Sequence, residues 1–403
     1  MGDAEQILVR VEPDITALDA AAWDVCANPS GSESSDSRPY NPFISHAFLS
    51  ALEKSRSASA ETGWAPHHLV LDDGRGGVLA CMPCYLKSHS QGEYVFDYGW
   101  ADAFERAGGR YYPKLQAAVP FTPVTGRRLL VPDGPEAETR EGYLLNAAAT
   151  LLERHGASSL HLTFLTQGEW ERAGHLGLLR RTDQQFHWRN QDYGSFDEFL
   201  SALTSRKRKL IKRERRGACD DSIRIRHYTG SDITETHWDA FFTFYLDTGS
   251  RKWGQPYLNR EFFSLIGQSM AERILLIMCE RDGRPIAGAL NFIGGDTLYG
   301  RYWGCIEDHR FLHFEACYYQ AIDFAIERSL SCVEAGAQGP HKLARGYVPQ
   351  TTYSAHLIAD PSLRSAVARF LDQERRYVEM ENEQLARHAP YRRGSDVTDG
   401  DDA

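Results

Sequence analysis

The chain has 403 residues, of which 42% are hydrophobic and 25% are charged, and it contains 19 Phe, 19 Tyr and 8 Trp. This length suggests two or three domains, and the composition excludes a mostly disordered chain. A net charge of -10 argues against a general nucleic-acid coat protein, although it leaves room for a local basic surface.

The first residues lack the pattern of a signal peptide, and no segment approaches the roughly 18 uninterrupted apolar residues of a membrane span. We therefore expect a cytoplasmic protein without integral membrane association. The eight cysteines are scattered, without the paired spacing of a metal site or a disulfide scaffold, so we expect reduced thiols and no metal. The one CxxC, from Cys81 to Cys84, lies in a run that reads as a strand, where a redox or zinc role is the weaker interpretation.

Two stretches of the chain show the same order of elements, which indicates a diverged internal duplication. Residues 67–87 read as two strands joined by a Gly-rich turn, and residues 273–305 read as three strands joined at RDGR and GGD. Each run leads into an aromatic-rich segment with a Tyr pair. Apolar residues in 314–326 recur every three or four positions, which predicts a helix, and a strand follows at 331–337. This order predicts an α/β (α+β) domain used twice.

Three segments read as periphery. Residues 28–39 and 131–142 are polar and rich in turn-forming residues, and the acidic residues 394–403 predict a disordered tail.

A basic segment lies between the two copies. Residues 194–217 have helical spacing, with Ser195 as the N-cap and Gly217 at the end. Eight of the twelve residues from 205 to 216 are Lys or Arg. A solvated surface is the ordinary interpretation of such a run, but four of its cations form one stripe that predicts a phosphate-binding face. These four residues are Arg206, Lys209, Arg213 and Arg216.

Several long motifs resemble the FemAB-like family of bacterial proteins, whose members are usually labelled GNAT-type N-acyltransferases or peptidoglycan biosynthesis/recognition proteins. The motifs include NPFISHAFLSALEKS, DTGSRKWGQPYL, LHFEACYYQAIDFAIE and EAGAQGPHKLARGY. The resemblance implies tandem GNAT-like domains, each a mixed, mostly antiparallel sheet flanked by helices. The expected divisions are a first domain over 1–190, a basic linking helix over 191–217 and a second domain over 218–393.

The similarity to the Fem ligases, which move an amino acid from aminoacyl-tRNA to an amine of a peptidoglycan precursor, is more distant. The stretch HKLARGY resembles their Phe-Lys-x-x-Phe-Gly motif. Lys342 and Gly346 keep the spacing of its Lys and Gly, whereas His341 and Arg345 replace its two Phe residues.

Amide formation requires a neutral amine and a donor for the developing oxyanion. Glu334, near the end of the 331–337 strand, is a candidate base or amine anchor, and a salt bridge to Arg345 or Lys342 is the alternative. Lys342 is a candidate to polarise a carbonyl or to bind phosphate. His341 suits either a proton shuttle or a structural turn, and Glu315, with His313 beside it, is a secondary catalytic candidate.

Further polar and aromatic residues are candidates for substrate binding because recognition pockets combine such side chains. They are Lys87, His89, Tyr94, Asp97 and Trp100 in the first copy, Arg251, Lys252 and Trp253 after an aromatic helix, and Gln338 and Arg345 near the motif.

The glycine-rich pyrophosphate motif of acetyl-CoA enzymes is absent from EDHRFLHFEA (307–316) and incomplete in ERAGGRYY (105–112). We expect no tightly bound cofactor and either acyl-CoA or aminoacyl-tRNA as co-substrate. The sequence favours an acyl or aminoacyl transferase that acts directly on an amine-bearing small molecule or peptide, such as a peptidoglycan-type precursor, with tRNA as a candidate partner. Two alternatives stay open: an acyl-CoA-dependent N-acyltransferase, and a silent binding protein for a cell-wall precursor or nucleic acid. The oligomeric state is also open.

Overall fold

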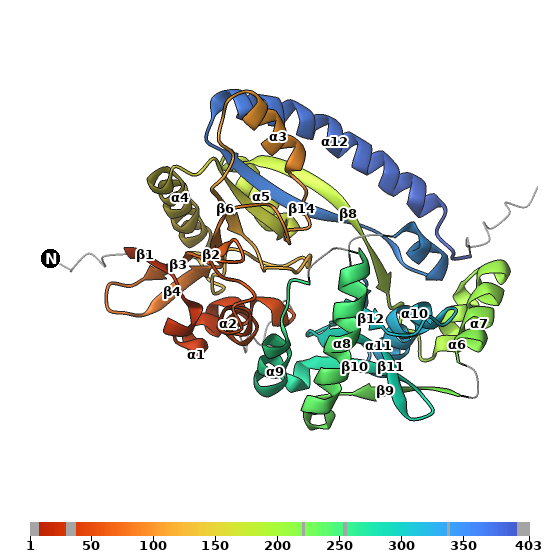
Figure 1. The fold of residues 1–403 in the computed structure, drawn as a ribbon. Coiled ribbons are helices and arrows are strands. Elements are labelled where there is room, and N and C mark those ends of the chain that lie inside the picture. The colour runs from red at the N-terminus through yellow and green to blue at the C-terminus, as the bar shows by residue number, and fades with distance from the viewer. Residues whose placement is uncertain (1–7, 30–37, 220–221, 253–255, 337–338, 393–403) are drawn as a thin grey trace, which may run out of the picture.

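The computed structural model describes residues 8–29, 38–219, 222–252, 256–336 and 339–392 (Figure 1). The strands of the first half are β1 (Leu8–Glu12), β2 (Trp64–Pro66), β3 (His68–Asp72), β4 (Val78–Met82), β5 (Cys84–Lys87), β6 (Lys114–Ala117), β7 (Ser159–Leu165) and β8 (Leu179–Arg189). Its helices are α1 (Ala20–Ala27), α2 (His46–Lys54), α3 (Tyr98–Arg106), α4 (Ala137–His155) and α5 (Gln167–His175).

The second half begins with two short helices and ends with a long one. Its strands are β9 (Ile223–Tyr228), β10 (Ile274–Arg281), β11 (Arg284–Ile293), β12 (Thr297–Cys305), β13 (Cys332–Glu334) and β14 (Val348–Ile358). Its helices are α6 (Phe196–Ala202), α7 (Ser205–Ala218), α8 (Glu235–Lys252), α9 (Arg260–Ser269), α10 (Leu312–Phe314), α11 (Gln320–Glu327) and α12 (Pro361–Arg387). A π-helical turn, η5 (Glu315–Tyr319), joins α10 to α11, and a 3-10 turn, η6 (Pro340–Arg345), precedes β14.

Most strands belong to one large mixed sheet, and this confirms the predicted fold class. The strand order is β2-β5-β6-β7-β14-β8-β13-β12-β11-β10-β9, and β1, β3 and β4 form a separate small sheet. The parallel neighbours are β6 with β7 and β12 with β13. In both cases a helix lies between the two strands in the chain, as a parallel connection requires, so the duplication expected from the sequence is visible in the topology.

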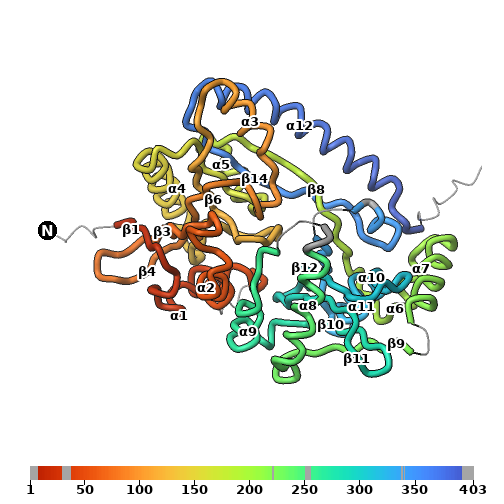
Figure 2. The backbone as a smooth tube through the Cα atoms, in the orientation of Figure 1, coloured from red at the N-terminus to blue at the C-terminus, as the bar shows by residue number. Residues whose placement is uncertain are grey.

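The C-terminal segment crosses into the first half, contrary to the chain order that we expected for the two domains. Strand β14 lies between β7 and β8, with His356 opposite both His161 and Leu179. Helix α12 then packs on β8 and β14 and beside α3 (Figure 2). The division into 1–190 and 218–393 therefore does not describe the sheet at residues 348–387, because pairing between distant strands depends on tertiary contacts that a local pattern does not encode.

The expected linking helix over 191–217 is two helices. Ser195 is the N-cap of α6, as predicted, and its side chain accepts a hydrogen bond from the Glu198 N–H. Leu203 adopts an extended conformation and pairs with Tyr391 in an isolated bridge, which separates α6 from α7. The basic stripe lies on α7 alone.

An aromatic core joins the two halves. Phe43 and Phe48 from the first half pack on Phe292 of β11, with ring centroids 5.1 and 5.4 Å apart. Such tilted and edge-to-face pairs stabilise beyond the area they bury, so the two halves are held as one body around the space between them. Within the described residues, no helix is long and apolar enough to cross a bilayer.

Candidate active site at the opening of the sheet

The sheet opens between β12 and β13. These strands pair only from Thr297 to Tyr299, opposite Cys332 to Glu334, and β12 then continues to Cys305 paired with β11. A bulge follows at Arg301, because Gly300 and Tyr302 face the consecutive residues Asn291 and Leu290 of β11. Bulges of this kind re-aim side chains beside functional sites.

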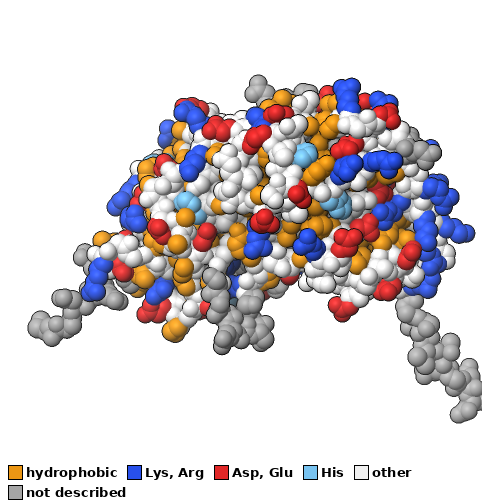
Figure 3. Space-filling view, turned by 90° about the horizontal axis from the view of Figure 1, so that it is seen from below, with side chains coloured by type: hydrophobic (Ala, Val, Ile, Leu, Met, Phe, Trp, Pro, Cys, Tyr) orange, Lys and Arg blue, Asp and Glu red, His pale blue; other side chains and the backbone are white. Residues whose placement is uncertain are grey.

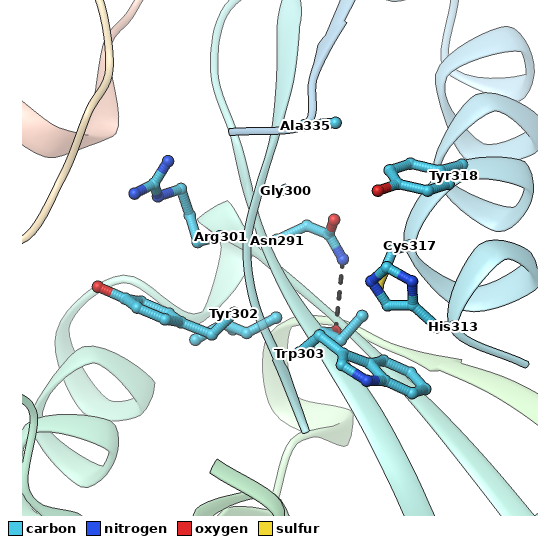
Figure 4. Close-up of a pocket in the computed structure, with 11 residues that line it drawn as sticks. Asn291, Gly300, Arg301, Tyr302, Trp303, His313, Cys317, Tyr318 and Ala335 are labelled. Atoms are coloured by element: carbon cyan, nitrogen blue, oxygen red, sulfur yellow. Dashed lines mark hydrogen bonds between the residues drawn. The ribbon is translucent and has the colours of Figure 1, made fainter. Parts of the chain in front are cut away.

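A cavity of about 100 Å³ fills the opening. Asn291, Trp303, His313 and Tyr318 line it on one side of β12, whereas Arg301 and Tyr302 point away from the other side (Figure 4). Asn291 is fixed because its amide nitrogen donates to the carbonyl oxygens of Leu275 and Ala289, at 3.2 and 3.4 Å. This bonding leaves the amide oxygen of Asn291 as the atom that is presented to a bound group.

Glu334 is the last residue of β13 and is only 8% exposed. Its nearest basic group is the His187 imidazole, whose Nε2 lies 3.8 Å from Glu334 Oε1. Burial raises the pKa of the Glu334 carboxyl to about 8, although Arg301 and Arg189 act in the opposite direction. Neither Arg345 nor Lys342 forms a salt bridge with Glu334 among the described residues, so the paired alternative is not seen. A carboxyl that titrates near neutral pH is suited to accept a proton.

Lys342 lies on η6 and is 3% exposed. Its Nζ donates to the carbonyl oxygens of Ala335, at 2.6 Å, and Gly336, at 2.8 Å. Ala335 lines the cavity, so the ammonium group lies one peptide away from it. Burial lowers the pKa of Lys342 to about 7, and the positive charge of Arg301 acts in the same direction.

His341 lies at the outer edge of the same turn. Its Nε2 is 3.0 Å from the hydroxyl of Tyr318, which lines the cavity. Burial lowers the pKa of His341, and the charges of Arg345 and Lys342 add to this effect. The imidazole is therefore in hydrogen-bond contact with the cavity wall and does not form the wall itself.

The first half contacts the far side of β12. The Tyr302 hydroxyl donates to the Phe121 carbonyl at 3.1 Å, and Arg301 Nη2 donates to the same oxygen at 3.5 Å. Burial raises the pKa of Tyr94, and the positive charge of Arg301 opposes this effect. Within the described residues Arg301 has no carboxylate partner. A guanidinium in this state is available to an anionic or carbonyl group of a substrate.

Two other candidates have structural partners. Arg345 forms a bidentate ion pair with Glu214 of α7, with N–O distances of 2.8 and 3.1 Å. Its guanidinium also lies 3.5 Å from the ring centre of Phe314. Glu315 accepts hydrogen bonds from Arg215, at 3.0 Å, and from Gln320, at 2.7 Å. Neither residue lines the cavity.

The basic stripe is present as the spacing predicts. Arg206, Lys209, Arg213 and Arg216 are all exposed on α7. Lys and Arg residues gather at the end of the molecule where α7 lies (Figure 3). None of the four forms an ion pair with a described residue, whereas Lys212 and Arg215 of the same helix do. An unpaired stripe of this kind can contact successive phosphates.

The candidates of the first copy divide between two places. Lys87 and Asp97 join a buried ion cluster in which Lys114 Nζ bonds to Ser90, at 2.8 Å, to Glu93, at 2.7 Å, and to Asp97. Trp100 stacks on His161 beside this cluster. His89 bonds to the Thr62 carbonyl on the surface, and of the five candidates Tyr94 approaches the second half.

Residues Trp253 and Gln338 lie outside the described residues. Arg251 and Lys252 fall in the last turn of α8, and the structure describes their backbone alone.

Sequence reasoning missed Asn291, Trp303 and Tyr318, which line the cavity, and also Arg301 and His187. Asn291 interrupts the apolar run of β11, so a buried amide in a strand was the signal that could have identified it. Arg301 and His187 carry no comparable signal, since a bulge and a cross-strand partner both depend on pairing.

The chain as a whole is similar to several solved structures and to one protein family. FemX, in a crystal structure, matches with a TM-score of 0.52 at 12% identity over 87% of this chain and 98% of FemX. A tandem GNAT protein from the clavulanic acid biosynthesis pathway matches with a TM-score of 0.46 at 11% identity, covering 88% of this chain and 99% of that one. L-PGS from Bacillus licheniformis matches with a TM-score of 0.46 at 8% identity, covering 89% and 100%.

At such identities the match to FemX establishes the fold. No functionally curated protein matches the sequence. The model of the FemAB-like family, described as peptidoglycan biosynthesis/recognition, matches residues 14–393. The chain therefore belongs to the FemAB-like family.

Proposed function

We propose that the protein is an acyl or aminoacyl transferase that forms an amide at the opening between β12 and β13. The observation that carries this proposal is the position of two buried groups beside a lining residue of the small cavity: Glu334 precedes Ala335 in the chain, and Lys342 donates to the Ala335 carbonyl. Their pKa values approach neutrality from opposite sides. Buried groups that titrate near neutral pH and lie in a cleft are characteristic of acid-base sites.

The proposed reaction uses these groups in sequence. The acceptor enters as an ammonium group beside Glu334. The ionised form of this carboxyl, whose share grows as the pH rises toward 8, takes one proton and leaves a neutral amine. The amine nitrogen attacks the donor carbonyl carbon, and the electron pair of the carbonyl moves to oxygen. Lys342 stabilises this oxyanion by hydrogen bonding. Collapse of the intermediate breaks the bond to the leaving group, which takes up a proton as the amide forms.

The cavity supports a small acyl group as the transferred unit. A volume of about 100 Å³ has room for a short acyl chain. The Asn291 amide oxygen can accept a hydrogen bond from a polar substituent on that group. An amino group on the acyl unit is one such substituent, and this supports an aminoacyl donor beside a simple acyl donor.

The leaving group would lie toward the basic stripe. The four exposed cations of α7 fit a phosphate chain, and the second copy lacks the glycine-rich pyrophosphate loop of acetyl-CoA enzymes. These two features together favour a donor with several phosphates, such as aminoacyl-tRNA, over acyl-CoA. The family description supports a peptidoglycan-type precursor as the amine acceptor.

A transfer assay tests the proposal. The protein is incubated with a nucleotide-linked muramyl peptide and either charged tRNA or short acyl-CoAs, and the product mass is measured. We expect a new amide with one donor class, its loss in Glu334→Gln, and its retention in Glu327→Gln, which removes an exposed carboxylate from neighbouring α11. Binding of the precursor without any amide, unchanged by Glu334→Gln, would show a silent binding protein instead.

A further inference from the structure

One acid interrupts the basic run of α7. Glu214 points inward, is 3% exposed, and receives both prongs of the Arg345 guanidinium at 2.8 and 3.1 Å. The Tyr319 hydroxyl donates to the same carboxylate. Glu214 therefore joins α7 to two other elements, η5 and η6, through charge-assisted bonds that are strong where water is excluded.

Arg345 in turn holds the turn that carries Lys342. Its Nη1 donates to the His341 carbonyl at 2.7 Å, across the base of η6. Lys342 extends from this turn to the carbonyl oxygens of Ala335 and Gly336 at the cavity. An unbroken series of polar contacts thus runs from Glu214 to the cavity wall.

A glycine with positive φ lies at each end of this turn. Gly339 and Gly346 flank η6 with φ of +122° and +93°, backbone conformations that residues with a Cβ rarely adopt. A Cβ at Gly346 would also lie 2.6 Å from the Phe199 ring. Among the described side-chain contacts of η6, the Glu214–Arg345 pair is the buried ion pair.

The outer face of the same helix carries the four exposed cations described above. A second inward contact, from Arg215 to Glu315 and Asp323, fixes the helix to the η5–α11 segment. Because α7 bears a phosphate-binding face on one side and the anchor of η6 on the other, a small shift of the helix would move both.

We propose that Glu214 is a positioning residue that couples occupancy of the outer face of α7 to the placement of Lys342. This inference rests on the proposed function, since it takes the stripe as the phosphate-binding face of the donor. Donor phosphates bound to α7 would fix the position of the helix. Through the Glu214–Arg345 pair, the fixed helix would then order η6 with Lys342 at the cavity. Coupling of this kind is reciprocal, so an ordered η6 also favours phosphate binding.

The test measures hydrogen exchange in peptides covering residues 339–346. It is done with and without an RNA hairpin of acceptor-stem sequence that carries no amino acid. We expect the hairpin to slow exchange there in the wild type and to have no such effect in Glu214→Gln, while both proteins bind the hairpin. Asp197→Asn is the matched control, because it removes an exposed carboxylate that pairs with Lys212 of α7 at 3.4 Å and has no contact with η6. It should behave as the wild type.

Turnover gives the second measurement. Glu214→Gln should lower kcat about tenfold or more. The donor KM should rise by a smaller factor, because the coupling is lost whereas the stripe is intact. If Glu214→Gln fails to fold, Tyr319→Phe replaces it. That variant removes only the hydrogen bond that the Tyr319 hydroxyl donates to the Glu214 carboxylate, so it should show a smaller effect in the same direction.

The outcomes separate this inference from the proposed function. If the hairpin binds but does not protect 339–346, or protects it equally in Glu214→Gln, the coupling is wrong and the phosphate-binding role of the stripe stands. If the hairpin does not bind, the phosphate-binding role and the coupling both fail.

Discussion

Replacing Glu334 by Gln should abolish transfer and make the protein more stable. Burial holds the pKa of this carboxyl at about 8, against an ordinary 4.5. The folded state therefore keeps a proton that the unfolded state releases, and wild-type stability falls as the pH rises from 4.5 to 8. Gln cannot ionise, so it removes this cost.

The size of the gain follows from the two pKa values. At about 1.4 kcal/mol per pKa unit, the full cost above pH 8 is roughly 5 kcal/mol. The part present at pH 7 is about 3 kcal/mol, and the part at pH 5 is below about 1 kcal/mol. Urea denaturation of both proteins at pH 5, 7 and 9 measures these differences directly, with Glu327→Gln as an exposed control. A Glu334→Gln variant whose stability gain is the same at pH 5 and pH 9 would refute the reasoning, as would wild-type turnover.

Three further outcomes are expected. Lys342→Met should lose turnover while staying folded. Its stability relative to wild type should decline as the pH rises from 7 to 10.5, because Lys342 loses its proton at a lower pH in the folded state than in the unfolded state. A difference that does not depend on pH would contradict this. Lys114→Met should cost about 3–5 kcal/mol in thermal or urea unfolding, because Asp97 loses its cation and Glu93 keeps only Lys87, at 3.7 Å; a cost below about 1 kcal/mol would contradict the cluster. Replacing the stripe by Gln should reduce the slope of log affinity for an RNA hairpin against log salt by about 3 to 4, whereas replacing four exposed arginines elsewhere should not. The stripe is Arg206, Lys209, Arg213 and Arg216, and the control set is Arg110, Arg154, Arg369 and Arg376.

The elements that carry the site could be predicted from the sequence, whereas its contacts could not. The hairpins of 273–305 appear as β10, β11 and β12, and the apolar stripe of 314–326 appears as η5 and α11. These predictions are confirmed because turn chemistry and periodicity are local properties of the sequence. Glu334 and Lys342 could be nominated by residue type and motif, but in a polar stretch nothing local indicates that both are buried.

The contacts of the site arise from long-range pairing. His187 approaches Glu334 only because β8 pairs with β13, across about 145 residues of chain. Arg301 points toward the first half because a bulge interrupts β12. Arg345, which the sequence suggested for substrate, instead pairs with Glu214, the one acidic residue of the basic segment 205–216. A local sequence pattern shows which elements form. Which side chains meet across distant elements depends on the topology of the fold.

The duplication explains why the site lies in one half. In each half a strand, a helix and a parallel strand follow one another, giving β6 and β7 in the first and β12 and β13 in the second. Where the second half opens into a cavity, the first holds Lys114 bonded to Glu93 and Asp97, all fully or nearly fully buried. Lys114 of β6 holds the loop that carries Glu93 and Asp97. The proposed site thus lies at the opening of the second copy, whereas in the first copy buried charge fixes a loop to the sheet.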